Sequence, residues 1–138
     1  AMATDTTSID EVMSAYEALW NGDFSKTDVL AESVVVQSPT IGEAHGRDAV
    51  EQVIREMHAA FPDFHIETDE MLAGDETVML EWTITGTHEG EYMGAPPTGR
   101  EIEVQGMAKL QISDGKVHED RIYSNPQEML AQLGPADE

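Results

Sequence analysis

The stretch ETVMLEWTITGTH, residues 76–88, decides which fold class the sequence predicts. Its apolar side chains recur at every second position, which is the period of a β-strand with one buried face. The same alternation is present at residues 64–72, 100–112 and 116–124. Short glycine-containing turns separate the four stretches, so the second half of the chain is predicted to form an antiparallel sheet.

Two amphipathic helices are predicted upstream of these strands. Ser8 and Glu11 have the spacing of a capping box, so the first helix is expected to begin after Ser8. It is expected to end at Asn21, which precedes a glycine. The second helix follows Gly46 and ends at Pro62, because proline cannot continue a helix.

The remaining elements complete an α+β fold. A strand is expected at residues 33–37 and a loop over residues 38–45. Asn125 followed by Pro126 predicts the start of a short last helix, which ends at Gly134. The connections between the later strands are too short for helical crossovers. The sequence therefore predicts a curved antiparallel sheet wrapped around helices.

The composition limits the partners that the protein can have. The chain has 138 residues, with 7 Lys and Arg against 28 Asp and Glu, and its net charge is −21. Such a charge repels phosphate backbones and anionic lipids, so neither nucleic acid nor a membrane is an expected partner. The acidic residues are spread along the whole chain, which we interpret as adaptation to high salt. The length predicts a single domain at residues 8–134, after a disordered segment at residues 1–7.

The sequence contains no Cys, which excludes disulfides, thiolate catalysis and Cys-based zinc sites. The His residues do not have the spacing of a metal-binding motif, and no glycine-rich phosphate loop precedes a helix. No metal and no organic cofactor are therefore expected. The sequence has neither a long apolar span nor a signal-peptide pattern, so a cytoplasmic protein is predicted.

Several segments resemble one known family. They are WTITGTHEGEYMG at residues 82–94, PPTGR at 96–100, AFPDF at 60–64, DGKV at 114–117 and QLG at 132–134. Together they resemble the SnoaL-like polyketide cyclase and ester cyclase family, which has the cone-shaped fold of nuclear transport factor 2. The resemblance implies a helix-covered pocket on the concave face of the sheet, used for aldol-type ring closure without a cofactor. Relatives with this fold also imply a homodimer formed through the outer face of the sheet.

The resemblance implies that Asn125 occupies the position of the family's catalytic Asp. The last strand of the family carries a Glu, then a Trp, then the Asp, and the same register gives Glu119, Arg121 and Asn125. An amide cannot exchange protons near neutral pH, so Asn125 either binds a ligand carbonyl or a catalytic water, or only caps the last helix. This register implies that Tyr123 also lines the pocket, and that Asp120 lies on the opposite face.

His88 is the main candidate for moving a proton, because imidazole titrates near neutrality and His88 lies within the matched segment. The alternative is a histidine at a strand end that faces solvent. More distant candidates are His45, His65, His118, Glu81, Glu119 and Asp120. Arg121 is a candidate for binding an anionic ligand, or it pairs with Glu119.

The ligand is expected to be a hydrophobic small molecule with a carbonyl group. The residues predicted to contact it are Tyr16, Trp20, Met57, Phe61, Trp82, Tyr92, Met93, Arg121 and Tyr123. One interpretation is an aldol-type cyclase, or a related lyase or isomerase, in which His88 and Asn125 are catalytic. The other is a binding protein without catalysis, because Asn125 and Ser38 stand where related families place acids.

Overall fold

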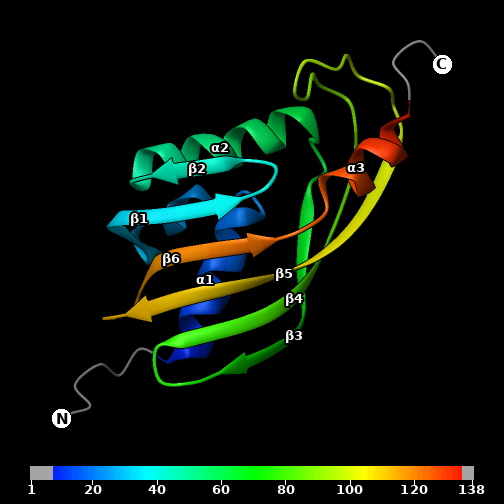
Figure 1. Cartoon of the computed structure of the whole chain (residues 1–138). Coiled ribbons are helices and arrows are strands. Elements are labelled where there is room, and N and C mark those ends of the chain that lie inside the picture. The colour runs from blue at the N-terminus through cyan, green and yellow to red at the C-terminus, as the bar shows by residue number, and fades with distance from the viewer. Residues whose placement is uncertain (1–7, 135–138) are drawn as a thin grey trace.

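The computed structural model describes residues 8–134 of the chain (Figure 1). The helices are α1 (Ile9–Trp20), the 3-10 helix η1 (Phe24–Val29), α2 (Arg47–Ala60) and α3 (Pro126–Leu133). The strands are β1 (Leu30–Ser38), β2 (Gly42–His45), β3 (His65–Ala73), β4 (Thr77–Thr87), β5 (Glu101–Ser113) and β6 (Lys116–Tyr123). The predicted disorder of residues 1–7 lies outside the described residues.

The ends of the helices follow from local hydrogen bonds. The predicted capping box is present, because Ser8 Oγ accepts the backbone N–H of Glu11 at 3.1 Å and the Glu11 carboxylate accepts that of Ser8 at 3.1 Å. The positive φ of 94° at Gly46 lets the chain turn from β2 into α2. No helix among the described residues is both long enough and apolar enough to cross a membrane.

The strands form one six-stranded sheet in the order β2-β1-β6-β5-β4-β3. All neighbouring pairs are antiparallel except β1 and β6, which are parallel. The prediction of a purely antiparallel sheet was therefore wrong at this pair. β1 ends at Ser38 and β6 begins at Lys116, so a long connection separates them and no tight turn forces them to be antiparallel. The loop predicted at residues 38–45 also contains a strand, β2, which is too short to show an alternating pattern.

The core lies between the concave face of the sheet and the helices α1 and α2, which cross that face (Figure 1). β4 shows how the alternation builds it. Val78, Leu80 and Trp82 are buried, whereas Met79 and Glu81 between them are exposed. The predicted α+β arrangement of a curved sheet around helices is therefore confirmed.

A β-bulge in β6 changes which side chains face the core. On β5, Gln111 pairs with Glu119, but the next residue pairs with Val117, so His118 has no partner position of its own. Val117 and Asp120 are consequently both buried, although strict alternation would put them on opposite faces. The bulge turns Asp120 toward the concave side.

Candidate functional site

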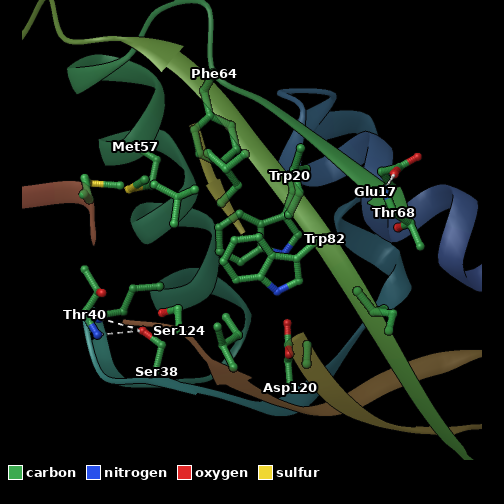
Figure 2. A pocket seen from close by; sticks show the side chains of 18 of the residues that line it. Glu17, Trp20, Ser38, Thr40, Met57, Phe64, Thr68, Trp82, Asp120 and Ser124 are labelled. Carbon is green, nitrogen blue, oxygen red and sulfur yellow. Dashed lines mark hydrogen bonds between the residues drawn. The ribbon is translucent and has the colours of Figure 1, made fainter. Parts of the chain in front are cut away.

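A cavity opens on the concave face of the sheet, between α1, α2 and the start of α3 (Figure 2). Most of its wall is apolar and comes from both helices and from the inner faces of the strands. The apolar lining residues include Trp20, Met57, Phe64, Trp82, Ile84 and Ile122. Polar side chains of the lining include Asp120, the pair Glu17 and Thr68, and a wall formed by Ser38, Thr40 and Ser124.

Asp120 is the buried carboxyl group of the cavity, with 3% of its surface exposed. Its Oδ2 accepts a hydrogen bond from the Tyr16 hydroxyl at 2.5 Å. Its Oδ1 is buried without a hydrogen-bond partner among the described residues. Burial raises the pKa of Asp120 from 3.8 to about 7, although the hydrogen bond from Tyr16 opposes the rise. A carboxyl group with such a pKa can both accept and donate a proton near neutral pH.

Tyr16 is positioned by α1 to hold this carboxyl group. It is buried, and its ring packs edge to face against that of Trp20, with 6.4 Å between the ring centroids. Burial and the neighbouring charge of Asp120 raise the pKa of Tyr16 well above its ordinary value of 10.0. Tyr16 therefore stays protonated and donates its hydrogen bond to Asp120 throughout the neutral range.

The polar groups at the opposite wall are partly used by the backbone. Ser38 Oγ accepts the N–H groups of Thr40 and Ile41, at 3.2 and 2.7 Å. Asn125 lines the cavity and also caps α3, since its Oδ1 accepts the N–H of Gln127 at 3.0 Å. These bonds leave the Ser38 hydroxyl proton and the Asn125 amide N–H groups available to a ligand.

The charge of the cavity wall is negative or neutral. Besides Asp120, the one carboxylate that lines it within the described residues is Glu17, whose Oε2 accepts the N–H of Thr68 at 2.8 Å. No Lys, Arg or His of the described residues is part of the wall. Within residues 8–134 no group of three or more acidic or His side chains is arranged to hold a metal ion.

The cavity brings together six of the residues that the sequence predicted for the site. These are Tyr16, Trp20, Met57, Trp82, Tyr92 and Asn125. The others lie elsewhere. Phe61 is fully buried behind the wall, and Met93 is 69% exposed on the loop after β4.

His88 is neither beside the cavity nor turned to solvent. It is fully buried, and its ring packs on that of Phe61 with 5.5 Å between the centroids. Its Nδ1 lies 3.1 Å from Thr98 Oγ1 and accepts the N–H of Thr98 at 3.3 Å, which places its proton on Nε2. Nε2 is buried without a partner among the described residues. His88 thus fixes the loop between β4 and β5 against α2.

The register inferred for the last strand placed the wrong face in the pocket. Arg121 and Tyr123 lie on the outer face, where Arg121 Nη2 is 3.5 Å from Glu119 Oε2 and Tyr123 is 55% exposed. The bulge at His118 explains the difference, because it shifts the alternation by one residue. The local pattern also contained a signal for Asp120: charged Glu119 and Arg121 alternate with Asp120 and apolar Ile122. Glu119 and Arg121 carry opposite charges two positions apart, so their shared face of the strand is favoured to face solvent.

Comparison with known proteins gives a family match and a relative of named activity. The sequence model of the SnoaL-like polyketide cyclases matches residues 10–133. The aklanonic acid methyl ester cyclase DnrD of Streptomyces peucetius is 28% identical over 136 residues, covering 94% of this chain and 92% of DnrD.

Several solved structures share the fold of this chain. AclR, a proposed hydroxylase of Streptomyces galilaeus, is 32% identical with a TM-score of 0.76, and the match covers 92% of this chain and 83% of AclR. IdmH, a proposed polyketide cyclase of Streptomyces antibioticus, is 28% identical with a TM-score of 0.78 and covers 91% of this chain and 98% of IdmH. These matches confirm the predicted cone-shaped fold. Because the family match spans nearly all of the described residues, the chain belongs to the SnoaL-like polyketide cyclase family.

Proposed function

We propose that the protein closes a ring in a neutral, carbonyl-containing small molecule by an intramolecular aldol reaction, with Asp120 as both base and acid. The observation that carries this proposal is the buried carboxyl group of Asp120. One of its oxygens is held by Tyr16 at 2.5 Å, the other is buried without a hydrogen-bond partner among the described residues, and the side chain lines the cavity. Its pKa of about 7 suits proton transfer in both directions.

The reaction needs no external oxidant, reductant or second substrate. Asp120 removes a proton from the carbon beside a carbonyl group, and the resulting enolate carbon attacks a second carbonyl of the same molecule. A carbon–carbon bond forms, and the second oxygen becomes an alkoxide. Protonated Asp120 returns its proton to that alkoxide, so the product has the same composition as the substrate. Tyr16 keeps the carboxyl group oriented through both transfers.

The wall of the cavity supports a neutral substrate. The described part of the wall has two carboxyl groups and no cation to pair with an anionic ligand. An ionised acid would be desolvated beside Asp120 without compensation, at a cost of several kcal/mol. An ester of the same acid avoids this cost. We therefore propose that the enzyme accepts esters or ketones and rejects free carboxylic acids.

The substrate of DnrD provides the test, because DnrD is named as a cyclase of aklanonic acid methyl ester. The protein is incubated with this ester, and separately with the free acid, and the products are separated and weighed by mass spectrometry. We expect a new isomer of unchanged mass from the ester and none from the acid. A product that has gained an oxygen atom would instead indicate a hydroxylase, the activity proposed for AclR.

A matched pair of variants on β6 makes this test specific. Asp120→Asn removes the proposed base and keeps the shape of the side chain, while Glu119→Gln removes the next carboxylate, which pairs with Arg121 outside the cavity. We expect the first to abolish ring closure and the second to retain it. Equal turnover by both variants would exclude Asp120 as the base. Binding of the ester without turnover in the unmodified protein would favour the non-catalytic alternative.

We also propose that the protein is a cytoplasmic homodimer that works in high salt. Exposed apolar side chains on the outer face of the sheet support the dimer, since they form two cross-strand pairs, Leu72 with Met79 and Met107 with Tyr123. Light scattering in molar salt tests the dimer, and unfolding measured in dilute buffer and in molar salt tests the adaptation to salt. A monodisperse monomer would contradict the dimer, and a fold as stable in dilute buffer as in molar salt would contradict the adaptation to salt.

A further inference from the structure

Aldol chemistry needs a hydrogen-bond donor for the oxygen that becomes negative, in addition to a base. Tyr16 is the hydroxyl nearest to the base, but its proton is already donated to Asp120. Ser38 and Thr40 lie along another wall of the cavity, away from Asp120 (Figure 2). The other lining side chains with an N–H or O–H group, Asn125 among them, are therefore the candidate donors.

Trp82 has the required position. It lies on the inner face of β4, is 6% exposed and lines the cavity. Figure 2 shows the nitrogen end of its indole ring turned toward Asp120. An indole N–H can only donate, so it selects an acceptor atom such as a carbonyl or enolate oxygen.

The neighbouring strand fixes the orientation of this ring. Trp82 pairs with Gly106 of β5, and a Cβ atom at position 106 would lie only 2.2 Å from Cζ2 of the indole and 2.5 Å from Cη2. The indole ring therefore covers Gly106, and a side chain at position 106 would displace the ring. Gly106 serves as a positioning residue, because its missing side chain sets the direction of the indole N–H.

We propose that Trp82 and Asp120 form a subsite for one oxygen atom of the ligand, in which the indole N–H donates to that oxygen. The proposal deepens the proposed function, and rests on it for the identity of the oxygen as that of the enolate. When Asp120 takes the proton, it becomes neutral and the charge moves to the ligand oxygen. The hydrogen bond from Trp82 then strengthens as the charge develops.

The test uses two aromatic probes of similar size, 2-naphthol and 2-methylnaphthalene, of which only the first has an oxygen. The chain contains two Trp residues, so a ¹⁵N-labelled sample gives two indole N–H signals. The variant Trp20→Phe leaves one of them and so assigns the signal of Trp82. We expect 2-naphthol to move the Trp82 signal downfield, and 2-methylnaphthalene to leave it without a downfield shift.

Two variants test the geometry through the dissociation constants of both probes. Trp82→Phe keeps most of the apolar ring and loses the N–H, so 2-naphthol should bind about fivefold more weakly while 2-methylnaphthalene changes by less than about twofold. Gly106→Ala keeps every polar group but displaces the indole, and should reduce the preference for 2-naphthol in the same way. Folding of each variant is checked by circular dichroism, and the NMR measurement on the unmodified protein requires no variant.

The outcomes separate this inference from the proposed function. If 2-naphthol binds in the cavity and the Trp82 signal does not move, the subsite is wrong, whether or not the ester is cyclised. If the signal moves and Trp82→Phe removes the preference, the subsite is supported even when the aklanonic ester is not turned over. A preference that survives both Trp82→Phe and Gly106→Ala would overturn the proposal.

Discussion

Asp120 and His88 are buried to a similar degree, yet they lie in different surroundings. Each has one polar atom without a partner in the described structure, Oδ1 of Asp120 and Nε2 of His88. The other oxygen of Asp120 is held by Tyr16, and the residue lines the cavity. The other nitrogen of His88 is held by Thr98, and its ring packs against Phe61 behind the cavity wall.

The segment that carries the family motifs and the strand that carries the proposed base are therefore separate parts of this fold. The segment at residues 82–100 carries the most specific family motifs, but only Trp82, Ile84 and Tyr92 of this segment line the cavity. The strand β6 has an inconspicuous pattern, and it supplies the ionisable group. A buried histidine behind the wall is therefore a weaker indication of catalysis than a buried carboxyl group that lines the cavity.

The largest effect is expected on kcat when Asp120 and His88 are each substituted in a separate variant. Asp120→Asn should lower kcat for ring closure of aklanonic acid methyl ester by about 10²- to 10⁴-fold, because a general acid and base is lost. His88→Gln should lower it by less than about threefold, because His88 does not line the cavity. Steady-state kinetics at pH 7 measure both. If a folded His88→Gln variant lost as much kcat as Asp120→Asn, His88 would take part in the reaction and the contrast between the two residues would be wrong.

The second expected effect concerns stability and depends on pH. The pKa of Asp120 is about 7 in the folded protein and 3.8 as its ordinary value, so the folded state binds the proton more tightly than the unfolded state. Stability therefore falls as the pH rises from about 4 to about 7, and the loss attributable to Asp120 is about 4 kcal/mol above that range. Asp120→Asn removes this pH-dependent loss of stability, because an amide side chain does not ionise.

Urea unfolding of both proteins between pH 4 and pH 8 measures the difference. We expect the free energies of unfolding to converge near pH 4, and the Asn variant to be the more stable at pH 8. Glu119→Gln is the control, since this carboxylate is partly exposed beside Arg121. A constant difference across the range would show that the carboxyl group of Asp120 is not buried in its charged form.

The sequence predicts the framework of the fold better than its site, for reasons that particular residues show. Ser8 with Glu11 and Asn125 with Pro126 predict helix starts, because capping depends on neighbours in sequence. The parallel pairing of β1 with β6 joins residues far apart in the chain, so no local pattern contains it. The bulge at His118 has no signature of its own, and it alone decides which side of β6 faces the cavity.

A smaller effect should follow when the partner of Asp120 is removed. The hydrogen bond from Tyr16 lowers the pKa of Asp120, so Tyr16→Phe should raise that pKa further. The rising limb of the profile of kcat/KM against pH should then move to higher pH, by about one pH unit. Tyr92→Phe is the matched control, because Tyr92 also lines the cavity but makes no hydrogen bond to Asp120 among the described residues. If the pH profile shifted only in Tyr92→Phe, the hydrogen bond that lowers the pKa of Asp120 would come from Tyr92 and not from Tyr16.

The smallest expected effect concerns Asn125, which touches both the cavity and the start of α3. Asn125→Ala loses the cap, so the free energy of unfolding should fall by about 1 kcal/mol. Asn125→Asp keeps the cap and should stay within about 0.5 kcal/mol of the unmodified protein. Urea unfolding measures both variants at pH 7. If Asn125→Ala instead keeps its stability and loses turnover, the amide acts on the ligand, and the acid–base chemistry of β6 extends beyond Asp120 to the end of the strand.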